Sequence, residues 1–409
     1  DWYRFVLSYP PHLVRSYLED FGLKPESTVL DPFCGTGTTV VEAKLNHMRG
    51  VGLEANPFPQ FASSVKIDWR VDPDQLLALA AQIAEMALAV LAAQGIDDWH
   101  MQATGSVELR ALDPEAQSLL ITGSISPLPL HKTLVLLDCL WGHEGAPGYR
   151  HGLLALGNAL VNTIGNLRFG PEVGVGKKKH DTPVVAAWLA EVRRIADDLR
   201  TVYGRPYPDC LVHLADARRL GEVIAPASVD AVITSPPYPN EKDYTRTTRL
   251  ETVVLGFVND RAQLRALKQT LVRSNTRGVY QADQDDHWIA EHAAIQELAA
   301  AIESRRVAMG KTSGFERLYP RVTRLYFGGM ARHLAELRPI LRPGALLAYV
   351  VGDQASYLRV MIRTGQLLAG IAERLGYQVV RIDLFRTRFA TATQSDLREE
   401  VVVLRWPGN

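Results

Sequence analysis

The sequence predicts an α/β protein with a doubly wound, mostly parallel sheet. Its strand patterns alternate with helical patterns, which favours parallel strands with helices on both faces. The expected strands are residues 27–31, 50–54, 210–213, 230–234, 345–351, 377–384 and 400–405. Because only a loop separates the last two strands, we expect them to form an antiparallel hairpin at the edge of the sheet.

The first elements form one βαβ unit. The strand at 27–31 runs into a glycine-containing turn, and a helical pattern from Val40 to Asn46 follows. The next strand, 50–54, ends in an acidic residue, Glu54. Towards the C-terminus, helical patterns over 326–341 and 359–375 alternate with the strands in the same way.

Two segments interrupt this alternation, and we expect both to be insertions into one sheet domain. Residues 71–200 are mostly helical and rich in Ala and Leu, and their first helix starts with Asp72 as N-cap and Pro73 in the first turn. Residues 245–325 are polar and partly helical. The expected sheet domain therefore comprises residues 1–70, 201–244 and 326–409.

The composition excludes several classes of protein. With 47% hydrophobic residues, the 409-residue chain is too apolar to be disordered. We expect no membrane-spanning helix, because Gln82 and Glu85 interrupt the most apolar run, Leu76 to Ala93. We also expect no signal peptide. Three cysteines are too few for a disulfide framework and lie in no metal-ligand spacing, which favours a cytoplasmic protein without a metal site.

Charge is unevenly distributed along the chain. The 45 basic and 45 acidic residues give a net charge of zero, which by itself speaks against a nucleic-acid partner. However, residues 71–200 hold ten basic and fifteen acidic residues, whereas residues 245–278 hold seven basic and two acidic ones. The neutral total therefore conceals a basic stretch that is suited to phosphate contacts.

The turn after the first strand has the features of a nucleoside-binding loop. Gly35 and Gly37 can adopt positive φ angles and let backbone amides approach a ligand. Glu54 follows Asp31 at about the distance at which dinucleotide-binding folds place a ribose-binding acid. A third motif glycine is missing, since position 40 is Val40, which favours a ligand smaller than a dinucleotide. The alternative is a tight turn that only packs strand against helix.

The run from Asp31 to Thr39 resembles the S-adenosylmethionine motif of the amino-group DNA methyltransferases, which have a Rossmann-like sheet. The resemblance implies that this turn wraps the methionine part of the cofactor and that Glu54 holds the ribose. Asp216 matches the acid that meets the adenine. The cofactor-binding residues implied in this way are Tyr9, Asp31, Phe33, Cys34, Gly35, Gly37, Thr38, Thr39, Glu54, Ala55, Asp216, Ala217 and Ser235.

The segment upstream of this motif, Ser8 to Val14, is similar to the family's segment that closes over the cofactor. An ordinary helix start at the proline pair Pro10-Pro11 accounts for the same residues equally well.

The strand at 230–234 ends in Ser235-Pro236-Pro237-Tyr238, and we assign the catalytic role to these four residues. The prolines stiffen the loop. The exocyclic amine of a nucleobase is a poor nucleophile, because its lone pair is delocalised into the ring. The Ser235 hydroxyl and the Pro236 carbonyl can accept both amine hydrogens, while Tyr238 stacks on a base that has left the duplex. The alternative is a chance tetrapeptide in a proline-rich loop.

The form of this loop indicates which base is methylated. Ser-Pro-Pro-Tyr resembles the cytosine-N4 group, although some members with Ser act on adenine N6, and related loops occur in RNA guanine-N2 enzymes. A cytosine-C5 mechanism would need a Pro-Cys loop, so Cys34 and Cys210 are interpreted as core residues. The chain departs from the cytosine-N4 group in two respects. Its cofactor motif precedes the Ser-Pro-Pro-Tyr loop, whereas the common order in that group is the reverse, and no motif matches the family's target-recognition region. A non-catalytic cofactor- or DNA-binding module is the remote alternative.

The expected partner is double-stranded DNA, with a restriction endonuclease as a possible second partner. On charge and proximity, residues 245–325 are the expected target-recognition region. The candidate contacts with DNA are Arg246, Arg249, Arg273, Asn275 and Arg277. A charged outer face of an amphipathic helix explains Arg261, Arg265 and Lys268 equally well.

Overall fold

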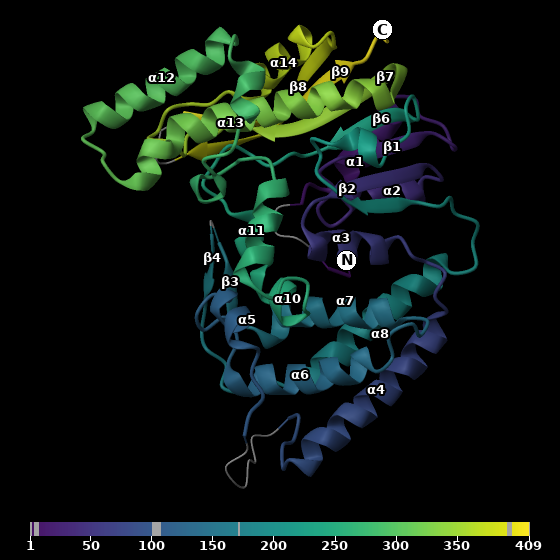
Figure 1. The fold of residues 1–409 in the computed structure, drawn as a ribbon. Helices are drawn as coiled ribbons and strands as arrows, with labels where there is room; N and C mark the ends of the chain where they lie inside the picture. Colours follow the sequence, from purple (N-terminus) through teal and green to yellow (C-terminus); the bar gives the residue numbers. More distant parts are fainter. Residues whose placement is uncertain (1, 4–7, 100–107, 171, 391–394, 409) are drawn as a thin grey trace. The chain divides into compact units, whose positions relative to one another are not determined.

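The computed structural model describes residues 2–3, 8–99, 108–170, 172–390 and 395–408 (Figure 1). The chain divides into two compact units, each assembled from several segments. The sheet unit comprises Tyr9–Asn56, Tyr207–Asp243 and Leu267–Asn409. The helical unit comprises Asp1–Ser8, Pro57–Pro206 and Tyr244–Ala266.

These boundaries differ from the predicted domains. Residues 57–70 belong to the helical unit, because Phe58 of α3 (Pro57–Lys66) is fully buried there and its ring contacts Tyr3 and Phe257. The segment 245–325, predicted as one insertion, is divided between the two units near residue 266. The polar composition of this segment gave no signal for that division.

The sheet unit contains seven strands in the order β5-β2-β1-β6-β7-β9-β8. Their bounds are β1 Thr28–Asp31, β2 Arg49–Glu54, β5 Leu211–Leu214, β6 Val229–Thr234, β7 Leu341–Gly352, β8 Gln378–Ala390 and β9 Ser395–Arg405. All seven predicted strands are present. The predicted hairpin also forms, but β9 pairs with β7 on its other side, so β8 is the edge strand and β9 runs antiparallel to both neighbours.

Helices cover both faces of this sheet, as expected for a doubly wound fold. On one face, α1 (Pro11–Asp20) and α2 (Thr38–Leu45) pack with strand residues such as Val29 and Ile233. On the other face, α13 (Gly314–Leu337) and α14 (Thr364–Arg374) pack with Leu30 and Val232 (Figure 1). Successive strand residues point to opposite faces, so each buried strand supplies both cores.

Helix α13 is longer than its sequence pattern predicts. The pattern begins at Tyr326, whereas the helix begins at Gly314. Ser313 and Glu316 form a reciprocal capping box that fixes this start. After Leu337 the chain forms a single 3₁₀ turn and enters β7.

The helical unit is built around α4 (Pro73–Ala93), α6 (Pro127–Trp141), α7 (Tyr149–Ala159) and α8 (Val184–Val202). Shorter elements are α5 (Pro114–Leu119), α9 (Tyr244–Thr247), α10 (Arg249–Val254) and a two-stranded sheet of β3 (Leu167–Phe169) and β4 (Val173–Val175) that the sequence did not predict. The predicted cap of α4 is confirmed, since the Asp72 side chain accepts hydrogen bonds from the amides of Asp74 and Gln75.

Helix α4 is long and apolar enough to cross a membrane by length and composition alone, contrary to the expectation from Gln82 and Glu85. A single helix of this kind is weak evidence for a membrane span. Its buried residues, Leu76, Ala80 and Ile83 among them, recur at helical spacing and pack within the helical unit against α6, α7 and α8. The core of the unit therefore accounts for the apolar residues on the buried face of this helix, whereas Met86, Leu88 and Val90 are exposed.

Candidate active site

The predicted cofactor and catalytic residues follow the carboxyl ends of four adjacent strands. Asp31 ends β1, Glu54 ends β2, Asp216 comes shortly after β5, and Ser235 follows β6. These strands are parallel neighbours in the sheet. Their carboxyl ends therefore meet at one edge of the sheet, which is where doubly wound folds bind their ligands.

The turn after β1 leaves open space for a ligand. Gly35 and Gly37 have φ angles of 51° and 85°, as the sequence predicts for a turn that needs glycine. No atom comes within 4 Å of the position that a Cβ of Gly35 would take, whereas the buried Cys34 side chain packs closely on Gly52. The backbone at Gly35 is thus accessible, while Cys34 is a core residue.

Asp31 joins the start of the sheet unit to the end of β6. Its buried carboxylate accepts hydrogen bonds from Thr234 Oγ1 at 2.5 Å, from the Tyr9 hydroxyl at 2.8 Å and from the Phe33 amide at 3.2 Å. The Tyr9 hydroxyl is also bonded to Thr39 Oγ1. Burial raises the pKa of Asp31, and the hydrogen bonds from these donors lower it by a smaller amount. Tyr9 therefore ties the segment before α1 to the glycine turn. Pro11 begins that helix, as the interpretation of an ordinary helix start predicts, while closure over the cofactor stays a prediction.

Glu54 faces the same turn. One carboxylate oxygen accepts from the Gly35 amide at 3.0 Å and the other from the Asn56 amide at 2.8 Å. A carboxylate offers about four acceptor positions, so acceptor capacity remains for a ligand. Burial outweighs the backbone amide donors of Asn56, Gly35 and Ala55 and raises the pKa of Glu54 to about 7. Ala55, between these partners, contributes backbone to the turn.

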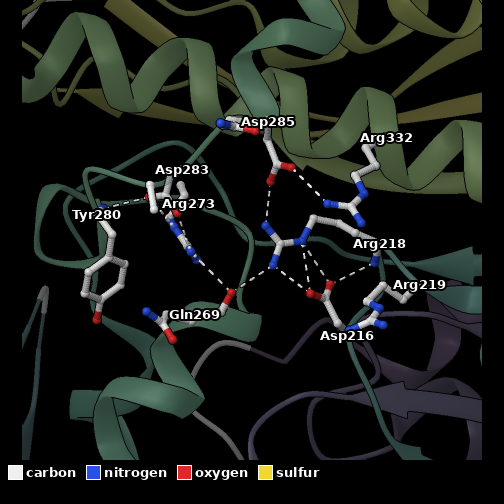
Figure 2. A pocket seen from close by; sticks show the side chains of 11 residues that line it. Asp216, Arg218, Arg219, Gln269, Arg273, Tyr280, Asp283, Asp285 and Arg332 are labelled. Carbon is white, nitrogen blue, oxygen red and sulfur yellow. Dashed lines mark hydrogen bonds and ion pairs between the residues drawn. The ribbon is translucent and has the colours of Figure 1, made fainter. Parts of the chain in front are cut away.

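Asp216 lies in a charged cluster that the sequence did not reveal (Figure 2). The guanidinium of Arg218 donates to both of its carboxylate oxygens and also to Asp285. A cavity of about 420 Å³ opens beside this cluster. The neighbouring Ala217 carbonyl accepts a hydrogen bond from the buried His333 ring at 2.8 Å. Burial lowers the pKa of His333 to about 4, so this ring is neutral at pH 7.

The Ser-Pro-Pro-Tyr loop is held against β7. The Ser235 hydroxyl donates to the Val350 carbonyl at 3.1 Å, and Pro236 behind it is buried. Tyr238 lies half-buried against Gly352, where a Cβ would come within 3.0 Å of its ring. The Tyr238 hydroxyl donates to Glu399 of β9 at 2.9 Å. No motif around Glu399 could have indicated this contact, since it joins residues 161 positions apart.

The chain after Tyr238 is tied to residues 268–276 by three contacts. The Lys268 ammonium lies 2.8 Å from Asp243, and the Thr276 hydroxyl donates to Glu241 at 2.9 Å. Asn275 Nδ2 donates to the Lys242 carbonyl at 3.1 Å. The segment predicted to contact DNA thus supports the loop that continues the Ser-Pro-Pro-Tyr motif.

This packing changes the interpretation of the predicted DNA contacts. Arg273 is only 4% exposed, and its guanidinium forms a bidentate pair with Asp283 while also donating to backbone carbonyls. A buried and fully engaged guanidinium is unavailable to a phosphate, so the geometry does not support this contact. In the helical unit, Arg249 donates to Thr245 and to the Leu119 carbonyl, and Arg246 is half-buried. Arg277 alone among the predicted arginines is exposed.

Within the described ranges, no group of three or more His, Cys, Asp or Glu side chains is arranged to hold a metal ion.

Three comparisons bear on the family. The DNA methylase family model N6_N4_Mtase matches residues 4–59, which include the glycine turn and Glu54. The type II methyltransferase M.BsoBI of Geobacillus stearothermophilus is 24% identical over 99% of this chain and 84% of its own length. The type II methyltransferase M.AvaI of Nostoc is 29% identical over 44% of this chain and 38% of its own length.

The chain is thus similar to amino-group DNA methyltransferases, over residues 4–59 by the family model and over nearly its whole length to one type II methyltransferase. This similarity implies S-adenosylmethionine as the cofactor. The accessible backbone at Gly35 and the spare acceptors of Glu54 fit a nucleoside with ribose hydroxyls. Among solved structures, the rRNA methyltransferase AviRa of Streptomyces viridochromogenes covers 97% of this chain and 85% of its own, at 12% identity and a TM-score of 0.30, which is too distant to inform the function.

Proposed function

We propose that the protein is a DNA methyltransferase that transfers a methyl group from S-adenosylmethionine to the N4 amine of a cytosine flipped out of the duplex. The observation that carries this proposal is the hydrogen bond from Ser235 to Val350. Because the hydroxyl proton is directed at the Val350 carbonyl, the Ser235 oxygen is left as a hydrogen-bond acceptor. An acceptor is what an amine substrate requires at this position.

The residues of the loop then act on the amine. The Ser235 oxygen and the Pro236 carbonyl accept its two hydrogens, which favours a pyramidal nitrogen with its lone pair out of the ring plane. The bound cofactor supplies an electrophilic sulfonium methyl group. Fixed orientation of the two acceptors is the main catalytic contribution of the protein, since correct positioning can remove much of the barrier to a transfer between bound groups.

Tyr238 supplies the face on which the flipped base stacks. Gly352 lets its ring lie close against the end of β7, and Glu399 holds its hydroxyl. Extruding a base costs a few kcal/mol, and stacking on an aromatic ring returns about 1–3 kcal/mol. An immobilised ring loses little further entropy when the base binds, so its fixed position favours the extruded state.

The choice of cytosine depends on the serine of the loop, and it is tested by the product. DNA methylated by the purified enzyme is digested to nucleosides and analysed by mass spectrometry. We expect N4-methylcytosine. If the only product is N6-methyladenine, the choice of cytosine is wrong while the amine mechanism stands, and methylation of RNA but not of DNA would overturn the choice of substrate.

Double-stranded DNA is the partner that follows from this proposal, with target recognition assigned to residues 245–325. A restriction endonuclease for the same site is the proposed second partner, since methylation of one defined site protects it from such an enzyme. The proposed location is the cytoplasm, where the DNA is accessible.

Arg277 is the arginine best placed for a phosphate contact. It is exposed, and it follows Asn275 and Thr276, which bond to the loop after Tyr238. We expect Arg277→Gln to weaken DNA binding for all sequences alike and to reduce the slope of log affinity against log salt by about 1. The measurement is fluorescence anisotropy at several salt concentrations, with Arg261→Gln as a matched control. An unchanged slope would exclude the contact.

Cofactor affinity is expected to fall as the pH drops through about 7. Burial raises the pKa of Glu54 to about 7, and a protonated carboxyl loses an acceptor position for a ribose hydroxyl. Calorimetric titration with S-adenosylhomocysteine on either side of this pH measures the effect. Glu54→Gln should bind weakly with no such pH dependence. Equal wild-type affinity across the range would contradict the assignment of Glu54 to the ribose.

A further inference from the structure

Arg218 is a buried cation with partners on two sides (Figure 2). Its side chain is 7% exposed. Towards the carboxyl edge of the sheet it donates to both oxygens of Asp216, at 2.9 Å from Nε to Oδ1 and 2.7 Å from a terminal nitrogen to Oδ2. On the other side it donates to Asp285 at 2.5 Å and to the Gln269 carbonyl at 3.0 Å. Every one of these contacts lies within the sheet unit.

The contacts on the far side prevent Arg218 from moving. Asp285 is itself shared, since Arg332 lies 3.3 Å from its other oxygen. Burial disfavours a charged guanidinium, but Asp216 and Asp285 outweigh it and raise the pKa of Arg218. Breaking either pair would leave a buried charge unpaired, which is strongly unfavourable. The orientation of Arg218 is therefore fixed by the fold.

The two-point contact also fixes the plane of the Asp216 carboxylate. Oδ1 accepts from both the amide and Nε of Arg218 at 2.9 Å, which uses its two acceptor positions. Oδ2 accepts from the terminal nitrogen at 2.7 Å and, at 3.2 Å, from the same Nε that bonds to Oδ1. Three N–H groups therefore bond to the carboxylate, and one of its four acceptor positions remains, on Oδ2. The Asp216 side chain is 12% exposed and comes shortly after β5, at the edge of the sheet where Glu54 ends the neighbouring β2, so a ligand at this edge can reach it.

We propose that Arg218 is a positioning residue for the cofactor, and that it orients Asp216 so that the remaining acceptor on Oδ2 binds the exocyclic amine of the cofactor's adenine. This inference rests on the proposed function, since it assumes S-adenosylmethionine at this edge of the sheet. Arg218 does not itself touch the cofactor. It makes Asp216 selective for adenine over purines without the amine.

The test compares two ligands that differ only at this amine. They are S-adenosylhomocysteine and its 6-deamino analogue, in which a hydrogen replaces the amine of the purine. A hydrogen bond to a charged group corresponds to roughly tenfold or more in affinity. We expect the wild type to prefer the adenine ligand by about this factor in calorimetric titrations. In Arg218→Gln the preference should largely disappear, because the carboxylate loses its fixed orientation.

Arg219→Gln is the matched control. Arg219 adjoins Arg218 and lines the same cavity, but its guanidinium is exposed and pairs with Glu222 on the surface. This variant should keep the wild-type preference.

Arg218→Lys should not restore the preference that Arg218→Gln loses, because a lysine ammonium cannot form the two-point contact. In kinetic assays Arg218→Gln should raise KM for the cofactor and leave kcat within about twofold.

Thermal unfolding of each variant separates positioning from folding. If Arg218→Gln does not fold, Asp285→Asn serves instead, since it keeps an acceptor for Arg218 while removing the charge that anchors it, and it should reduce the preference partly. Equal weakening of both ligands in the variant that folds would indicate a purely structural role and overturn the proposal. A wild type that transfers methyl groups yet binds both ligands alike would also overturn it, while leaving the proposed function intact.

Discussion

Replacing Ser235 with alanine is expected to reduce methyl transfer by about 100-fold or more while cofactor affinity stays near that of the wild type. The substitution removes one of the two acceptors that bind the amine hydrogens. Loss of one preorganised hydrogen-bonding group that acts in a transition state typically lowers the rate by about 10²–10³. The loop itself should keep its position, because Pro236 remains buried and Val350 stays in β7.

The assay is single-turnover transfer of a labelled methyl group to DNA, combined with calorimetric titration of S-adenosylhomocysteine. Tyr238→Ala should likewise abolish transfer, because the base loses its stacking surface. Tyr238→Phe is the matched control: it keeps the ring and removes the hydroxyl that contacts Glu399, so it should retain much of the activity. Full activity in either alanine variant would refute the assignment of the catalytic site.

The grouping of these candidate residues at one edge of the sheet could be predicted because each of them closely follows a strand that is recognisable in the sequence. The glycine turn follows β1 directly, and Ser235 follows β6 directly. Strands are recognised from local pattern, and parallel strands place their carboxyl ends together. Knowing that the strands alternate with helices was therefore enough to bring Asp31, Glu54 and Ser235 to one edge.

What the sequence could not predict depends on contacts between distant residues. Glu399 reaches Tyr238 across 161 positions, and Arg218 reaches Asp285 across 67. Nothing in the local pattern around Glu399 marks it as a partner of the catalytic loop. The place of β9 inside the sheet was missed for the same reason, since a hairpin can add either of its strands to the preceding one.

The basic stretch shows a different limit of sequence reasoning. Counting charges over residues 245–278 identified seven basic residues but not which of them are exposed. Arg273 is buried against Asp283, and Lys268 is paired with Asp243. Both stabilise the chain around the catalytic loop. The count therefore overstates the charge that this stretch can offer to DNA.

Replacing Asp31 with alanine is expected to eliminate measurable cofactor binding and to destabilise the sheet unit by roughly 2–4 kcal/mol. The hydroxyls of Tyr9 and Thr234 both donate to this buried carboxylate. Without it they lose their acceptor, and an unsatisfied buried polar group costs about 1–3 kcal/mol. The segment before α1 would also lose the hydrogen bond from Tyr9 to this carboxylate, which weakens its attachment to the glycine turn.

Two variants separate the loss of binding from the loss of stability. Asp31→Asn keeps the size and one carbonyl acceptor, so it should restore much of the stability while binding the cofactor weakly. Asp230→Ala is the second control, because that carboxylate accepts from the Thr28 amide and pairs with Arg342 near the opposite ends of β1 and β6. It should lower the unfolding temperature and leave cofactor affinity unchanged. If Asp31→Ala bound S-adenosylhomocysteine as tightly as Asp230→Ala, Asp31 would be a structural residue of the sheet alone, and the methionine end of the cofactor would have to be held by other groups of the turn.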